Sequence, residues 1–201
     1  MIQLLPPDTL PGYEHIKRYW DAHNHHSVAK ILPGEYYVTC HDEILMTVVG
    51  SCVSACIRDN VSGIGGMNHF MLPHISSDKW EFSCAASRYG HFAMECLISD
   101  ILKYGGLWKN LEVKLFGGAH IIKNMGKIGQ KNIDFVRTYL QTEELTLLAE
   151  DLGDIYPRKI LFYPVNGRVR VKKLQGIEQQ VLLERESAFQ RHLEMQPLTG
   201  D

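Results

Sequence analysis

The segment TVVGSCVSACIRDNVSGIGGMNHFMLP, residues 47–73, decides the fold of this chain. Its β-branched and apolar runs have strand length, and turn residues separate them. Ile44–Val49 reads as one strand and Val53–Ile57 as the next, with Gly50-Ser51 between them. Ile64–Leu72 is a third apolar run, interrupted by two glycines. The segment therefore predicts consecutive strands joined by short turns.

Two side chains in this segment carry chemistry. Cys52 follows the Gly-Ser turn, and His69 lies in the glycine-rich run beyond the next strand. A histidine beside a cysteine takes the thiol proton, and it can later deliver that proton to a leaving amine. A cysteine between Ser and Val on a strand is more often buried and inert, so the pair alone makes thiol-based acyl chemistry a hypothesis to test.

Further groups near Cys52 are candidates for supporting roles. A third polar group would orient the imidazole, and Thr47 and Asn68 are both close enough in sequence to do so. The Gly50-Ser51 turn would place backbone N–H groups near the sulfur, where they can form an oxyanion hole.

The rest of the chain alternates less regularly between helix and strand. The loop expected over residues 73–87 leads into the strongest helical pattern, Ser87–Tyr104, with Ser87 as its N-cap. Beyond it we expect a strand at Glu112–Phe116, a helix at Asn132–Gln141, and strands at Leu145–Ala149, Lys159–Tyr163 and Arg168–Lys173, the last two joined by an Asn166-Gly167 hairpin. The order predicts a single-domain α+β fold, with mixed, mainly antiparallel β-sheets layered with two main helices.

The two ends differ from the middle. Residues 1–33 form a proline-rich N-terminal extension in which His15–Lys30 is expected to make a short helix. Residues 34–175 are the expected catalytic domain, and residues 176–201 a tail that is either helical, over Glu178–Leu193, or disordered.

Composition excludes several classes of function. The chain has 201 residues and a net charge of -2, which gives no general attraction to nucleic acid or to an anionic membrane. No apolar segment approaches the roughly 20 residues that span a bilayer, and the start is too polar for a secretory signal, so we expect a cytoplasmic protein.

The five cysteines have no framework spacing and are expected to be free thiols. Cys56, four residues after Cys52, is expected to pack in the core, because the spacing does not match a CxxC motif. The cluster of His23, His25 and His26 invites a zinc interpretation, but no second ligand group of clear spacing follows it.

Six motifs together identify a family. The chain resembles the CheD family of chemoreceptor glutamine deamidases over roughly residues 34–174, through GSCVSACIRD, GIGGMNHFMLP, SRYGHFAMECLI, KLFGGAHI, IGQKN and DLGDIYPRKILFYPVNGRVRVKKL, in this order. One departure is Asp154, where the family commonly has a second glycine after DLG.

The resemblance implies a function and a site. Family members hydrolyse glutamine side chains of methyl-accepting chemotaxis receptors to glutamate and ammonia, without a metal or organic cofactor. The family's cysteine matches Cys52, its histidine matches His69, and its threonine on the preceding strand corresponds to Thr47. Tyr89, Phe116, Gly117 and Gly118 also match the family and are expected to be architectural, Asn132 to be architectural or functional, and His91 and His120 to be structural or surface residues.

The substrate would be a helix of the receptor, so we expect a shallow apolar groove beside Cys52. Trp80 and Phe82, in the expected loop, are candidates either for its rim or for core packing.

Two other functions stay open on sequence alone. One is a thiol hydrolase or transamidase with a different acyl substrate. The other is a binding module for receptors or for a CheC-like phosphatase, since CheD-family proteins in some bacteria bind and regulate such a partner.

Overall fold

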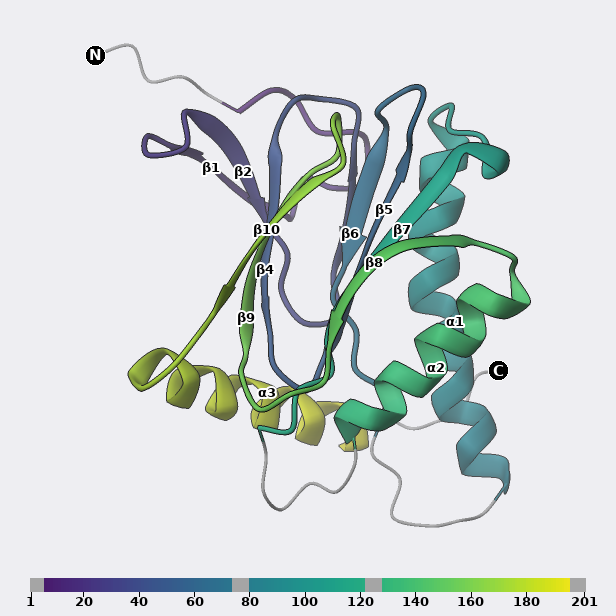
Figure 1. The fold of residues 1–201 in the computed structure, drawn as a ribbon, viewed down its shortest axis with the longest axis vertical. Helices are drawn as coiled ribbons and strands as arrows, with labels where there is room; N and C mark the ends of the chain where they lie inside the picture. Colours follow the sequence, from purple (N-terminus) through teal and green to yellow (C-terminus); the bar gives the residue numbers. More distant parts are fainter. Residues whose placement is uncertain (1–5, 74–79, 122–127, 196–201) are drawn as a thin grey trace.

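The computed structural model describes residues 6–73, 80–121 and 128–195. Ten strands form two five-stranded sheets that face one another (Figure 1). The first sheet has the order β1-β2-β4-β9-β10 and consists of Lys17–Asp21, His26–Lys30, Ile44–Val49, Arg158–Tyr163 and Arg168–Lys173. The second has the order β3-β6-β5-β7-β8 and consists of Tyr36–Thr39, Gly65–Asn68, Val53–Asp59, Leu111–Gly117 and Thr146–Leu152.

Most neighbouring strands are antiparallel. The parallel pairs are β2 with β4 and β7 with β8. The main core contains buried side chains from both sheets, among them Leu45 and Val49 of β4 and Val53 and Ala55 of β5. The expected α+β fold of mixed, mainly antiparallel sheets is therefore confirmed.

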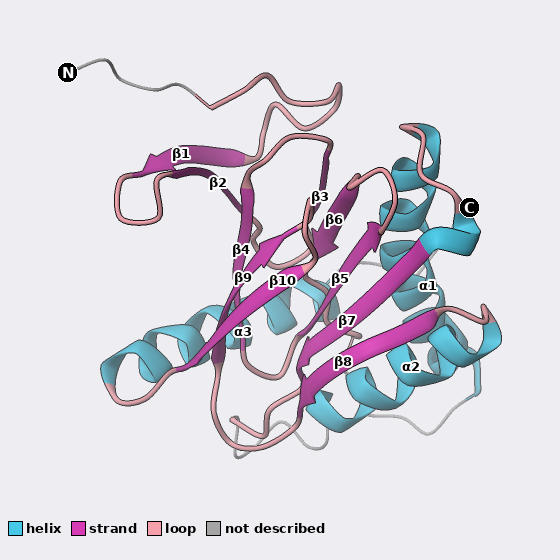
Figure 2. Ribbon diagram, turned by 45° about the horizontal axis from the view of Figure 1, so that its top comes forward, coloured by secondary structure: helices cyan, strands magenta, loops and turns pink. Residues whose placement is uncertain are grey.

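Three helices cover the sheets, with a short 3-10 turn before β7 (Figure 2). The helices are α1 (Trp80–Lys103), α2 (Ile128–Thr142) and α3 (Ile177–Met195). The 3-10 turn, η1, is Trp108–Asn110. Helices α1 and α2 pack on the second sheet, and α3 crosses below the ends of both sheets in Figure 1. None of the helices in the described ranges is long and apolar enough to cross a membrane.

The expected helix at His15–Lys30 is wrong. These residues form the hairpin β1–β2, and β2 pairs in parallel with β4, so the hairpin extends the first sheet. Val28 and Ala29 are buried at this sheet, and burial against β4 outweighs the weak helical tendency of the segment.

The helix predicted to begin at Ser87 begins at Trp80, so Ser87 lies inside α1 and cannot be its N-cap. Residues 74–79 of the expected loop, and the side chains of Trp80 and Phe82, lie outside the described residues. Within the described part of the tail, Ile177–Met195 form α3, which has buried side chains at Leu182 and Leu193. The division into residues 1–33, 34–175 and 176–201 stays a prediction.

The path from β4 to β5 positions the chemistry. Strand β4 belongs to the first sheet and β5 to the second, so Gly50, Ser51 and Cys52 cross from one sheet to the other. Phe70 bridges back to Val53, with N–H···O distances of 2.9 Å in both directions. This bridge brings the residue that follows β6, His69, to the start of β5.

Candidate active site

Cys52 lies on the short link between β4 of the first sheet and β5 of the second, and it is fully buried. Its sulfur, a ring nitrogen of His69 and a carboxylate oxygen of Glu186 all lie within 4.8 Å of one another. The predicted cysteine and histidine are thus brought together, and α3 supplies an acidic group that the sequence did not predict.

Thr47 fixes the ring of His69. The Thr47 hydroxyl lies 2.8 Å from the Ile31 carbonyl oxygen and 2.8 Å from His69 Nδ1. A carbonyl oxygen only accepts, so the single hydroxyl hydrogen is donated to Ile31 and the Thr47 oxygen accepts the Nδ1–H. A neutral imidazole has one N–H, and Nε2 therefore carries a lone pair. Among the described residues, Nε2 has no hydrogen-bond partner.

Asn68, the alternative for orienting His69, has other contacts. Its Oδ1 accepts from Ala55 N–H at 2.9 Å, and its Nδ2 donates to the Ala93 carbonyl at 3.0 Å. It ties β6 to β5 and to α1. The structure favours Thr47 over Asn68 as the partner of the imidazole.

The Gly50–Cys52 turn presents N–H groups to one carboxylate. Gly50 N–H donates to Glu186 Oε1 at 2.6 Å, and Cys52 N–H reaches the same oxygen at 3.4 Å. Ser51 donates to Oε2 through its N–H at 2.8 Å and through its hydroxyl at 2.7 Å. The N–H groups of the turn thus point to a common acceptor, and in this structure the acceptor is the Glu186 carboxylate.

Neighbouring residues hold this turn in place. Asn132 of α2 donates from Nδ2 to the Ser51 carbonyl at 2.8 Å, while its Oδ1 accepts from Leu72 N–H at 2.8 Å. Gly118 N–H donates to the Cys52 carbonyl at 2.7 Å. A Cβ on Gly117, which has φ +117°, would lie 2.2 Å from that carbonyl oxygen. Asn132, Gly117 and Gly118 therefore support the site through its backbone.

Burial and charge keep the pair neutral in this conformation. Burial, together with the charge of the Glu186 carboxylate and a hydrogen bond to it, raises the pKa of Cys52 well above its ordinary value of 9.0. Burial lowers the pKa of His69 to about 3. In this conformation the pair is therefore a thiol beside a neutral imidazole.

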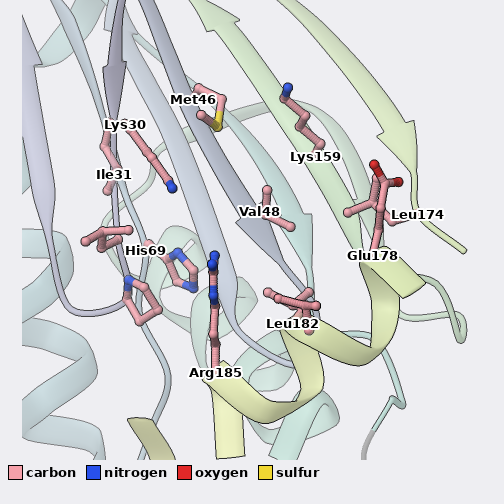
Figure 3. Close-up of a pocket in the computed structure, with 13 residues that line it drawn as sticks. Lys30, Ile31, Met46, Val48, His69, Lys159, Leu174, Glu178, Leu182 and Arg185 are labelled. Carbon is pink, nitrogen blue, oxygen red and sulfur yellow. The ribbon is translucent and has the colours of Figure 1, made fainter. Parts of the chain in front are cut away.

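A groove approaches the site from the side of the first sheet. It has a volume of about 390 Å³ and lies between β2, β4 and α3, with His69 on one side and Leu182 and Arg185 on the other (Figure 3). Its lining is mainly apolar, with cationic side chains at Lys30, Lys159 and Arg185. Cys52 does not line this groove, so the apolar groove expected beside Cys52 stays a prediction.

Several other sequence candidates lie away from this site. Cys56 is a buried free thiol in the main core, as expected. His91 packs edge-on against Phe135 and Tyr139, and His120 is exposed. Asp154 adopts φ +65°, so it keeps the turn that a glycine would make.

Within the described residues, one group of side chains is spaced closely enough to hold a metal ion. It consists of Cys52, His69 and Glu186. The donors around Glu186 argue against a cation there, because both of its oxygens face N–H groups. The cluster of His23, His25 and His26 does not form such a group.

Glu186 is the site residue that sequence reasoning missed. The signal was available as a pattern, because Leu182, Glu186, Gln190 and Leu193 are the buried positions on one stripe of α3. An acid on the buried stripe of a helix needs donors. The pattern does not say which donors they are.

Comparison with known proteins gives a consistent result. The family model described as "CheD chemotactic sensory transduction" matches residues 71–173. The chain is 46% identical over 197 residues to a probable chemoreceptor glutamine deamidase CheD of Hahella chejuensis, covering 98% of this chain and 93% of that protein. It is 47% identical to the protein of that name from Halorhodospira halophila, over 97% and 92% of the two chains. The corresponding protein of Rhodopseudomonas palustris is 40% identical, over 97% and 92%. The similarity thus extends beyond residues 34–174 to both ends of the chain.

Proposed function

This chain belongs to the CheD family, and from that membership and the geometry around Cys52 we propose that it is a cysteine-dependent hydrolase that deamidates glutamine side chains of chemotaxis receptors. The observation that carries the proposal is the pairing of Cys52 with His69: a ring nitrogen lies within 4.8 Å of the sulfur, and the Thr47 hydroxyl holds Nδ1 and leaves Nε2 without another partner among the described residues.

The first half-reaction forms a thioester. His69 Nε2 removes the Cys52 proton, and the thiolate attacks the carboxamide carbon of the substrate glutamine. The negative charge that develops on the carboxamide oxygen is stabilised by backbone N–H groups of the Gly50-Ser51-Cys52 turn. The imidazolium returns its proton to the nitrogen, the C–N bond breaks, and ammonia leaves.

The second half-reaction uses water. His69 Nε2 takes a proton from a water molecule, whose oxygen attacks the thioester carbon. Collapse of the intermediate breaks the C–S bond and gives a glutamic acid side chain, while the proton on His69 returns to the Cys52 sulfur. The new carboxyl group then ionises to glutamate, and its proton passes to the released ammonia or to water. The net reaction consumes one water and releases one ammonia. Besides the substrate and this water, the steps use only groups of the chain.

The role proposed for Thr47 is positioning. Its hydroxyl accepts from Nδ1–H, so it selects the tautomer in which Nε2 is the base, and it stabilises the imidazolium between proton transfers. The Thr47 hydroxyl also donates to the Ile31 carbonyl, and this bond keeps the hydroxyl oxygen oriented toward His69.

The test is mass spectrometry of peptides from a receptor cytoplasmic fragment that has been incubated with the chain. Conversion of defined glutamines to glutamate, absent with Cys52→Ala, would support the proposal and identify the targets. An unchanged fragment, also with a variant in which the sulfur is accessible, would contradict it.

A second function is favoured by one observation: Cys52 is fully buried and its pKa is raised, as expected of an inert thiol. A binding module for receptors, or for a CheC-like phosphatase, would need a docking surface but no reactive thiol. Binding of the fragment without conversion by any variant would favour this alternative.

A further inference from the structure

Glu186 makes contacts that are unusual for a helical glutamate. Its carboxylate is fully buried, and it accepts from Gly50 N–H at 2.6 Å, from Ser51 N–H at 2.8 Å and from the Ser51 hydroxyl at 2.7 Å. A buried charge destabilises a fold unless donors compensate for the lost hydration. The donors here are those assigned to the oxyanion of the reaction, so this carboxylate occupies the reaction site itself.

A carboxylate has the shape of the side-chain amide that it replaces, and glutamate is the product of glutamine deamidation. One oxygen of Glu186 lies against the N–H groups of Gly50 and Cys52, where the substrate oxygen would lie. The sulfur of Cys52 and the nitrogen of His69 are both within 4.8 Å of the carboxylate. Glu186 thus takes the position of a glutamyl side chain after reaction.

We propose that α3 is a tethered product analogue: it presents Glu186 in the place of a substrate side chain, and the chain acts on a receptor only while α3 is displaced. The inference rests on the proposed function and adds two features to it. It identifies the form in which the site accepts a substrate, a side chain presented by a helix. It also identifies a segment of the same chain as the competitor of the substrate.

The docking of α3 is firm at the site and weaker beside it. Leu182 packs with Ala119 and Ile121, and Leu193 joins the main core. Next to these contacts, the groove of about 390 Å³ leaves part of the helix, including Val181 and Arg185, without close packing on the first sheet. Because α3 lines a groove along part of its length and continues from the sheets only through residues 175–176, we expect that a competing helix can displace it.

Displacement also activates the nucleophile. The Glu186 carboxylate is one cause of the raised pKa of Cys52, and α3 takes part in burying the thiol. Removing α3 takes away the negative charge and admits water, and both changes favour the thiolate. The docked α3 therefore has two effects: Glu186 occupies the place of the substrate side chain, and ionisation of the Cys52 thiol is suppressed.

The sharpest experiment converts the analogue into a substrate. In full-length Glu186→Gln the carboxamide replaces the carboxylate, and the charge that opposes ionisation of Cys52 is removed. We expect the introduced glutamine to be converted back to glutamate, or to stop at a thioester with Cys52 after loss of ammonia. Peptide mass spectrometry distinguishes both products from the unreacted glutamine. The rate should not depend on protein concentration, because the reaction is intramolecular.

Two controls make the result specific. Glu186→Gln with Cys52→Ala should keep its glutamine, which excludes spontaneous deamidation. Glu184→Gln places a glutamine on the exposed side of the same helix, and this glutamine should also persist.

The second arm tests displacement in the full chain. Glu186→Ala removes the analogue, and Leu182→Asp keeps it but weakens its docking. Both variants should raise the rate of Cys52 alkylation by iodoacetamide and the initial rate on a receptor fragment. The expected increase is between about tenfold and about a thousandfold, the range open to a minor state populated at roughly 0.1–10%. Circular dichroism confirms that each variant is folded.

The outcomes separate the two proposals. Suppose that the wild-type chain deamidates a receptor fragment, that the glutamine of Glu186→Gln stays unchanged, and that neither Glu186→Ala nor Leu182→Asp is accelerated. That result would overturn the tethered analogue and leave the deamidase intact. No conversion of either the fragment or the introduced glutamine in any folded variant would overturn both. Conversion of the introduced glutamine that depends on Cys52 supports both, even if the receptor used is a poor substrate.

Discussion

Thr47 lies on β4 and contacts His69 through its hydroxyl, so the positioning role proposed for it can be tested by one substitution. Thr47→Val keeps the shape and removes the oxygen that accepts from Nδ1–H. We expect kcat on the receptor fragment to fall by about 10–100-fold, since a well-placed general base contributes typically about 10²–10⁴-fold and only part of this depends on its orientation. KM should change little, because Thr47 does not contact the substrate.

The control is Thr47→Ser, which restores the hydroxyl at the same position. It should recover most of the activity and return the pH profile of kcat to that of the wild type. Equal losses in the Val and Ser variants would mean that Thr47 acts through packing on β4, and the positioning role would be wrong.

At the scale of single residues, the sequence predicted most of the candidate site. Cys52 and His69 are close in sequence and sit at the ends of adjacent strands, so local patterns are enough to place them together. Thr47 was predicted as an alternative to Asn68, and only the contact of its hydroxyl with His69 Nδ1 in the folded chain separates the two. Glu186 lies 134 residues from Cys52 along the chain, and no local pattern links the two.

Among the strands and turns, the end of β7 is the element that fixes the Cys52 backbone. Gly117 has φ +117°, and an added Cβ would lie 2.2 Å from the Cys52 carbonyl oxygen. We expect Gly117→Ala to lower the free energy of unfolding by about 3 kcal/mol or more, from strain and collision together. Because that carbonyl belongs to the nucleophile, activity should be lost even in the folded fraction. Urea denaturation and the receptor assay measure the two effects.

Gly12→Ala is the matched control for backbone strain. Gly12 has φ +96° but no atom within 4 Å of an added Cβ. Gly12→Ala should lower the free energy of unfolding by about 1–2 kcal/mol, from the backbone conformation alone, and should leave the activity unchanged. If the two variants are equally stable and equally active, the contact of Gly117 with the Cys52 carbonyl does not matter to the site.

The elements also show where local sequence is insufficient. Strands β4 and β5 and the β9–β10 hairpin were predicted because their apolar runs and turn residues agree with the final fold. The hairpin β1–β2 was predicted as a helix, because its burial depends on pairing with β4, which lies further along the chain. A segment at the edge of a sheet takes its structure from a partner that its own residues do not specify.

At the scale of the whole molecule, the family motifs lie within residues 34–174, while the β1–β2 hairpin extends the first sheet and α3 packs beside the Cys52 site. The sheets and α1 are recognisable from the central sequence, whereas the closure of the site by α3 depends on contacts between distant parts of the chain. His69, the proposed base, is buried, and the intact fold keeps it neutral, which gives the molecule a characteristic response to acid.

The folded state holds the pKa of His69 at about 3, below its ordinary value of 6.5. Between these two values the unfolded chain binds a proton at His69 that the folded chain does not, so the free energy of unfolding falls as the pH falls. The loss is about 1.4 kcal/mol per pH unit for one proton, or about 2–3 kcal/mol between pH 6.5 and pH 4.5. Below about pH 3 both states are protonated and this contribution no longer changes.

The measurement compares urea denaturation of the wild-type chain with that of His69→Asn across this pH range. Asparagine keeps an N–H that can reach the Thr47 hydroxyl but does not titrate. The variant is expected to be the less stable protein at pH 7, and the difference should shrink as the pH falls, since only the wild type loses stability through position 69. Carboxylates that titrate in both proteins cancel in the comparison. Parallel pH profiles would mean that His69 is protonated or open to water in the folded chain, and the neutral base assigned to the resting site would then be wrong.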